Sequence, residues 1–172
     1  MKMRLAILAA ATALLASAAA AQQFPRLHEE NLAGQQVVLP DAAAGKVAVL
    51  VLGFSHASST PTGLWAKRAT EDFGKNPGFV LYQLAVIEDA PRFIRGMIIS
   101  GIKKGVPDSQ RATFIPVVHQ EAALKSLVAY KAEDDAYIVV LDRGGKVVHQ
   151  THGATVDPTY ADLRTKLAGL LK

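Results

Sequence analysis

Three nearly continuous apolar runs constrain the fold of this chain more than any other feature. They are Val47–Phe54, Phe79–Ile87 and Tyr137–Asp142. A short apolar run bounded by turn residues is typical of a strand that is buried on both faces. Such strands need a covering layer on each face of their sheet, which is the arrangement of α/β domains. We therefore expect one α/β domain with these runs at the centre of its sheet.

The segments between the runs carry helix signals. Thr60-Pro61 predicts a helix start, with a hydroxyl cap and a proline at the first helical position. Helical spacing predicts that this helix buries Trp65, Ala69 and Phe73. A short helix is expected over Glu121–Val128. A last helix is expected after Asp157-Pro158, with an apolar stripe formed by Tyr160, Leu163, Leu167 and Leu170.

A further helix is predicted over Ala90–Lys104. Gly96 and Gly101 weaken it, each by about 1 kcal/mol relative to alanine. Its apolar residues recur at helical spacing and are expected to pack against the sheet. They are Phe93, Ile94, Met97, Ile98 and Ile102.

Shorter extended segments complete the pattern. Extended segments are expected over Gln36–Pro40 and Thr113–Val118. The glycine turn Arg143–Gly145 predicts a hairpin whose second strand is Lys146–His152. The order of elements predicts a central mixed sheet of about four strands with helices on both faces. No internal repeat or long linker interrupts it, so a single domain is expected.

The N-terminus is typical of an export signal. Lys2 and Arg4 precede an apolar run, and small residues follow up to Ala21. This pattern predicts a signal peptide over residues 1–21, a domain over residues 22–172 and a periplasmic or secreted location. The alternative is a retained membrane anchor, although the apolar run is shorter than the roughly 20 residues that a span requires. No later run is long enough, so no transmembrane span is expected once the signal is removed.

Charge and composition exclude several classes of function. Removing Lys2 and Arg4 lowers the formal net charge from +4 to +2, so no nucleic-acid partner is expected. The chain has no cysteine, which excludes disulfide scaffolds, thiol enzymes and cysteine-bound zinc. It also lacks a Walker loop and a GxGxxG motif. His149 and His152 lie three apart in a predicted strand and point to opposite faces, so neither a metal nor another cofactor is expected.

The chain resembles the thioredoxin-like fold, in the branch of exported thiol oxidoreductases of the TlpA and peroxiredoxin type. The matching segments are Asn31–Leu39, Gly45–Phe54 and Tyr137–Val147. The resemblance implies a three-layer sandwich, with a central mixed sheet between helices. In redox members a Cys-x-x-Cys pair follows the first central strand, and a cis-proline faces it.

This chain departs from the redox pattern at both places. Ser59 and Thr62 occupy the two cysteine positions, and Ala136 stands near the place of the cis-proline. Hydroxyl groups cannot exchange electrons as thiols do. Thiol–disulfide oxidoreductase activity is therefore not expected.

A second set of short motifs is spread over the chain: Phe24-Pro25, Gly53-Phe54-Ser55, Trp65, Val86–Glu88, Arg92–Ile98, Gly105–Pro107 and Asp142–Lys146. In these motifs the chain resembles the family of the mitochondrial ATP synthase assembly factor, with its bacterial relatives. That resemblance implies a non-enzymatic helper that engages a hydrophobic membrane subunit, although an exported bacterial relative need not share that client.

Two groups of residues are candidate binding sites. The first is the loop at the former redox position, with His56, Ser58, Ser59, Thr60 and Thr62. A polar loop that caps a helix is the simpler interpretation, and an enzyme or small-anion site that uses His56 and the Ser58-Ser59-Thr60 hydroxyls is the alternative.

The second group is a basic cluster that could bind acidic partners or anionic lipid headgroups. Its residues are Arg92, Arg95, Lys103, Lys104 and Arg111. Arg92 and Arg95 are expected to point outward from their helix, and a solvated surface is the alternative. We therefore expect an exported, non-catalytic assembly or chaperone-like factor whose partner is an envelope protein, possibly a membrane subunit.

Overall fold

The computed structural model describes residues 22–172, and the expected signal peptide lies outside them. A mixed sheet of five strands forms the centre, in the order β5-β4-β3-β6-β7. β3, β4 and β5 run parallel, whereas β6 is antiparallel to β3 and β7 is antiparallel to β6. The sheet has one strand more than expected, because the extended segment near Thr113 pairs with β4 as an edge strand. The bounds are β3 (Val47–Gly53), β4 (Phe79–Val86), β5 (Phe114–Val117), β6 (Tyr137–Leu141) and β7 (Val147–His152).

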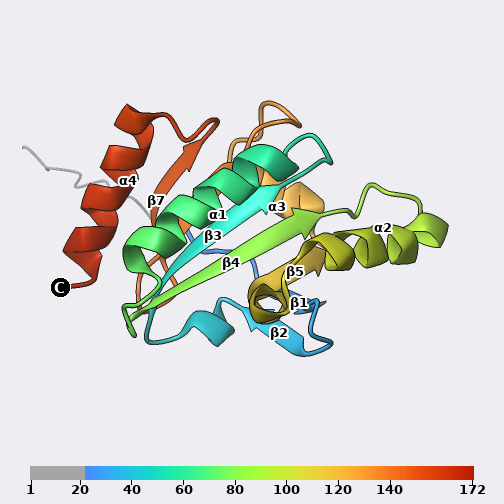
Figure 1. Ribbon diagram of the computed structural model, residues 1–172, viewed down its shortest axis with the longest axis horizontal. Coiled ribbons are helices and arrows are strands. Elements are labelled where there is room, and N and C mark those ends of the chain that lie inside the picture. Colours follow the sequence, from blue (N-terminus) through green and yellow to red (C-terminus); the bar gives the residue numbers. More distant parts are fainter. Residues whose placement is uncertain (1–21) are drawn as a thin grey trace, which may run out of the picture.

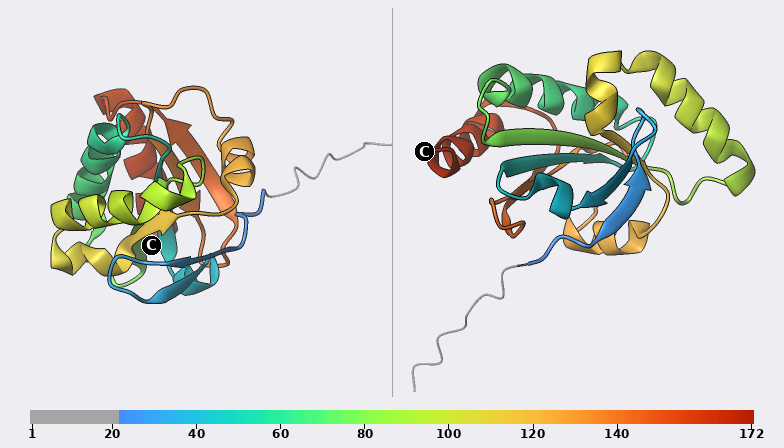
Figure 2. Two further views of the ribbon diagram at one scale, coloured as in Figure 1. Left: turned by 90° about the vertical axis from the view of Figure 1, so that its right-hand side faces the viewer. Right: turned by 90° about the horizontal axis from the view of Figure 1, so that it is seen from below.

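Covering elements lie on both faces of the sheet, as expected (Figures 1 and 2). One face carries α1 (Ser59–Phe73), α2 (Arg92–Gly105) and α4 (Asp157–Leu170). The other carries the antiparallel pair β1 (Leu27–Glu30) and β2 (Gln36–Leu39), with the short helices η1 (Asp41–Ala43) and α3 (Glu121–Leu127). A 3-10 helix, η2 (Asp108–Thr113), connects α2 to β5. None of the helices within residues 22–172 is long and apolar enough to cross a membrane.

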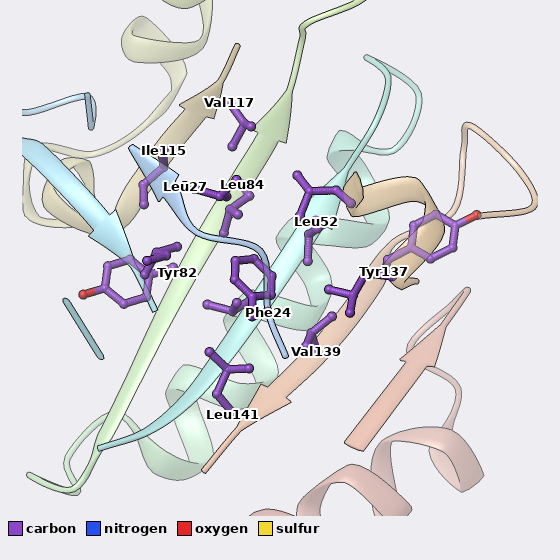
Figure 3. Close-up of a cluster of buried hydrophobic side chains, with 14 of the residues drawn as sticks. Phe24, Leu27, Leu52, Tyr82, Leu84, Ile115, Val117, Tyr137, Val139 and Leu141 are labelled. Carbon is purple, nitrogen blue, oxygen red and sulfur yellow. The ribbon is translucent and has the colours of Figure 1, made fainter. Parts of the chain in front are cut away.

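β3 lies at the centre of the core, and all of its residues are buried. Its side chains alternate between the two faces, as strand geometry requires. Leu50 and Leu52 pack toward the β1–β2 side, and Figure 3 shows Leu52 there with Phe24, Leu84 and Val139. Val49, on the opposite face, packs beneath α1 and α4. The continuous apolar run is therefore a central strand, as predicted.

The two helices beside β3 are attached by the residues that the spacing predicted. Trp65 and Ala69 of α1 are buried, and the Trp65 indole donates a hydrogen bond to the carbonyl of Gly153 at 2.8 Å. Tyr160, Leu163 and Leu167 of α4 are also buried, whereas Phe73 of α1 and Leu170 of α4 are half-buried against the same cluster. The Trp65 hydrogen bond links the middle of α1 to the segment that follows β7.

α2 differs from the expectation. Its Phe93 and Met97 side chains are 89% and 70% exposed, and no residue of the helix is buried. The prediction that the whole apolar stripe packs against the sheet is therefore wrong. Figure 2 shows the reason: α2 stands off from the sheet at the margin of the molecule. Only the side of the helix with Ile98 and Ile102 faces the sheet, across a cleft.

Candidate binding cleft beside the start of α1

Serine side chains hold the turn between β3 and α1. The Ser58 hydroxyl donates to the carbonyl of Ser55 at 2.8 Å, and the Ser58 amide donates to the Ser55 hydroxyl at 3.2 Å. The Ser55 hydroxyl in turn donates to the carbonyl of Glu133 at 2.7 Å. Ser58 is also buried. Its hydroxyl is therefore part of the framework of the turn.

Gly53 is required by this turn. A Cβ atom at Gly53 would lie 2.5 Å from Ser58 Oγ and 3.1 Å from Thr62 Cγ2. The first distance is shorter than any ordinary contact, so a side chain would push the turn apart. The glycine allows the chain to fold back directly from β3 into α1.

α1 begins two residues earlier than the Thr60-Pro61 signal predicted. Ser59 is its first residue, so Pro61 takes the third helical position and Thr60 does not cap the helix. The Thr62 hydroxyl donates to the carbonyls of Ser58 at 2.8 Å and Ser59 at 3.0 Å. Ser59 and Thr62 therefore lie in the first turn of α1, which is where the resemblance implies the cysteine pair of redox members.

His56 is exposed. Among residues 22–172, no hydrogen bond connects its ring to the hydroxyl of Ser58, Ser59 or Thr60. A nucleophile needs a base within hydrogen-bond reach of its hydroxyl. The Ser58 hydroxyl instead donates to the backbone carbonyl of Ser55, so Ser58 and His56 do not form such a pair.

A cleft of about 830 Å³ opens beside this turn. It lies between α2 and the carboxyl ends of the strands, which is where open α/β sheets bind ligands. The structure brings four of the five loop candidates to its wall: His56, Ser58, Ser59 and Thr62. Thr60 does not line it. Apolar side chains from the β4–α2 loop, α2 and the segment after α2 form much of the remaining wall: Ile87, Ile98, Ile102 and Val106.

Two glycines of α2 help to keep the cleft open. Gly101 and Gly105 both line it, and a Cβ atom at either position would meet no atom within 4 Å. They lie four residues apart and so on the same side of the helix. The sequence showed Gly101 only as a weakness in the helix, whereas in the structure it contributes free space.

The basic cluster is divided by the structure. Arg95 donates to the carbonyls of Ala90, at 2.9 Å, and of Glu88. Arg111 donates to the carbonyls of Val106, at 3.2 Å, and Lys103, at 3.1 Å. The expectation that Arg95 points outward is therefore wrong, because its guanidinium fastens the start of α2. Three residues of the cluster remain exposed: Arg92, Lys103 and Lys104.

A polar network around the buried Glu121 side chain, beside α2, was not visible in the sequence. Glu88 accepts a hydrogen bond from the Glu121 amide at 2.5 Å, and Glu121 accepts one from the Asp89 amide at 3.0 Å. Lys125 pairs with Glu121 at 2.6 Å and with Asp89 at 3.0 Å. Hydrogen bonding with Glu121 and then with Lys125 lowers the pKa of Asp89. The network ties the β4–α2 loop to α3, and the partners lie too far apart in the sequence for their spacing to reveal it.

His149 and His152 point to opposite faces of β7, as predicted. His149 Nε2 lies 3.6 Å from Asp162 of α4. His152 stacks on Tyr137 on the other face, and its Nδ1 lies 2.9 Å from Asp135. The two rings therefore do not converge on one point.

Comparison with solved structures gives a consistent result. A Sco-family cytochrome c oxidase assembly protein, BsSco, matches with a TM-score of 0.59 and 12% identity, over 87% of this chain and 94% of that one. The chain has a thioredoxin-like fold. A putative thiol:disulfide interchange protein DsbE from Chlorobium tepidum matches with a TM-score of 0.59 and 17% identity, over 88% and 97% of the two chains. A SCO1/SenC family lipoprotein from Bacillus anthracis matches with a TM-score of 0.56 and 17% identity, over 89% and 97%.

These identities establish the thioredoxin-like fold alone. No family model and no curated protein sequence matches the chain. On this thioredoxin-like scaffold, Ser59 starts the helix that follows the first central strand, and Ala136 directly precedes β6. The chain contains no cysteine, which fits a thioredoxin-like protein without thiol redox chemistry.

Proposed function

We propose that this protein is an exported, non-catalytic binding factor that holds an apolar segment of an envelope protein in the cleft between α2 and the sheet. The cleft is the observation that carries the proposal. Its volume of about 830 Å³ lies in the range of specific binding sites. Its isoleucine and valine side chains favour an apolar occupant, because binding removes their surface from water.

The assembly role is supported by resemblance at two levels. The short motifs shared with the ATP synthase assembly factor family imply a hydrophobic membrane subunit as client. Two of the similar structures belong to Sco-type proteins, one of which is described as a cytochrome c oxidase assembly protein. An apolar membrane-protein segment would match the wall of the cleft. The expected signal over residues 1–21 and the lipoprotein among the similar structures favour an envelope location.

The catalytic alternative has less support. It needs a hydroxyl that His56 can activate, yet the Ser58 hydroxyl is buried and bonded to the backbone. Thr62 also donates to backbone carbonyls. The hydrogen bonds of these two hydroxyls fit a structural role in the wall of the cleft better than a catalytic role.

Site-specific photocrosslinking tests the client proposal. A photoreactive phenylalanine analogue replaces Ile102, which lines the cleft, or Val156, which is 55% exposed outside it. Irradiation in the native envelope is expected to capture one envelope protein from position 102 and not from position 156. Crosslinked peptides should come from an apolar segment of that protein. Equal capture from both positions, or none from position 102, would contradict the proposal.

Filling the cleft gives an independent test. Gly101→Leu places a side chain in open space inside the cleft, and helix propensity favours leucine over glycine. The variant should fold normally and lose client capture. Gly169→Leu is the matched control, because Gly169 is an exposed glycine in α4 with open space around it. Normal capture by Gly101→Leu would show that the client does not occupy the cleft.

A further inference from the structure

We propose that the outer face of α2 binds the surface of an anionic membrane. The outer face consists of the exposed residues of this helix that point away from the cleft: Arg92, Phe93, Gly96, Met97, Ser100, Lys103 and Lys104. This surface is distinct from the cleft, so the inference goes beyond the client proposal and does not depend on it.

The apolar part of the outer face is unusually exposed. Phe93 is 89% exposed and Met97 70%, and they lie one helical turn apart. The small residues Gly96 and Ser100 lie beside them and leave both side chains prominent. An aromatic and a long flexible apolar side chain on one helical side are typical of helices that insert into the headgroup region of a bilayer.

The charge on α2 is complementary to an anionic surface. The helix contains four basic residues and no acidic residue. Arg92 lies at its first turn and Lys103 and Lys104 at its last, so positive charge flanks the apolar side chains at both ends. Within residues 22–172, none of these three cations forms an ion pair. Long basic side chains can reach lipid headgroups while the neighbouring apolar residues enter the interface.

Nearby acidic residues do not cancel this charge. Asp89 pairs with Lys125, and Asp108 pairs with Arg111 at 2.6 Å. The Glu88 carboxylate is directed toward α3, where it accepts a hydrogen bond from the backbone of Glu121.

The geometry of α2 fits a surface rather than a span. Its 14 residues give a length of about 21 Å, which is shorter than a bilayer core. Figures 1 and 2 show the helix at the margin of the molecule, with its long side open. Arg95 fixes its first turn to the β4–α2 loop. The helix can therefore lie flat on a membrane while the sheet stays in water.

Vesicle flotation tests the inference with purified protein. Vesicles of phosphatidylcholine with an equal part of phosphatidylglycerol should carry the wild type to the top of a gradient, and vesicles of phosphatidylcholine alone should not. Added salt should weaken the binding, because ions screen exposed charge. All variants must share the same N-terminal residue, which intact mass establishes, so that residues 1–21 cannot account for a difference between them.

Two variants with matched controls locate the contact. Phe93→Ser/Met97→Ser should lower binding at least about tenfold, because it removes two apolar side chains from the interface. Arg92→Glu/Lys103→Glu/Lys104→Glu should lower it by about fivefold or more for each charge. The controls are Leu64→Ser, an exposed apolar residue of α1, and Lys75→Glu/Lys166→Glu, two exposed cations outside α2. Both controls should bind as the wild type does.

Fluorescence gives a second measurement at one position. Trp65 is the single tryptophan and is 1% exposed, so its emission should not respond to vesicles. Phe93→Trp adds a tryptophan on the outer face, and its emission should shift to the blue with anionic vesicles. Failure of the wild type to float, equal loss in the control variants, or an unshifted emission would overturn the inference.

The result separates lipid binding from client binding. Outer-face variants should still capture the client in detergent, where no bilayer is present, and Gly101→Leu should still bind vesicles. If Phe93→Ser/Met97→Ser abolished protein capture in detergent while the wild type ignored vesicles, the outer face would bind a protein and the lipid inference would be wrong.

Discussion

The Ser58 hydroxyl occupies the space that a side chain on Gly53 would need, 2.5 Å from the position of its Cβ atom. Gly53→Ala should therefore lower the free energy of unfolding by about 2 kcal/mol, since overpacking a buried site costs of this order. Chemical denaturation measures the change. Combining it with Ser58→Ala should reduce the cost, because the clashing oxygen is gone. A neutral Gly53→Ala would contradict the tight turn. Gly63→Ala, in the open part of α1, is the control and should be neutral or stabilising.

The two arginines at the start of α2 should behave differently. Arg95→Glu removes donors to the carbonyls of Glu88 and Ala90, and is expected to lower the free energy of unfolding by about 1–3 kcal/mol. Arg92→Glu, on the outer face, should change it by less than about 0.5 kcal/mol. Thermal or urea unfolding distinguishes them. Equal effects of the two substitutions would contradict the assignment of Arg95 as an anchor.

His149 should make the fold sensitive to mild acid. Burial lowers the pKa of His149 below its usual value, with Asp162 opposing and Lys166 reinforcing the shift. The folded state therefore favours the neutral ring, and its contribution to stability is present above the unfolded pKa of about 6.5. That contribution should disappear as the pH falls through the lower folded pKa.

The measurement is the free energy of unfolding between neutral and mildly acidic pH. His149→Gln should flatten the acid side of the profile, and His28→Gln, at an exposed position, should leave it as in the wild type. A profile that His149→Gln does not alter would show that another group controls the acid sensitivity.

Placing cysteines at positions 59 and 62 tests whether these positions correspond to the redox pair of thioredoxin-like proteins. Ser59→Cys/Thr62→Cys should form a reducible disulfide, since residues three apart at a helix start bring their Cα atoms within the range that a disulfide spans. Alkylation with and without reductant, read by intact mass, detects the bond. Each single cysteine variant should stay reduced, and the wild type should not reduce insulin. If both thiols of the double variant stayed free under oxidising conditions, the turn would not have the geometry of a redox cysteine pair.

The central strands could be predicted from the sequence, because a strand that is buried on both faces is apolar at successive positions. The run Val47–Phe54 is apolar on both sides, and the structure uses its two sides in two core layers. The start of α1 was predicted to within two residues, at Pro61 instead of Ser59. The Thr60-Pro61 cap does not form, because Ser55 and Ser58 close the turn earlier through hydrogen bonds that no local signal reveals.

α2 shows where sequence patterning fails. Periodicity predicts that a helix has an apolar side, but it does not identify what that side contacts. Phe93 and Met97 belong to the same stripe as Ile98, yet they face solvent while Ile98 faces the cleft. The direction of Arg95 also depends on the path of the β4–α2 loop, which depends on Glu121 and Lys125 more than 25 residues further along the chain.

The position of α2 has a thermodynamic consequence. The helix is a wall shared by two surfaces, and neither surface is closed by the rest of the chain. If a ligand on one side restricts the motion of α2, a ligand on the other side has less motion left to restrict. Binding at the two surfaces would then be coupled with positive sign, and the coupling would be reciprocal. A membrane beneath the outer face would tighten the hold on a client in the cleft, and a client would tighten the hold on the membrane by the same factor.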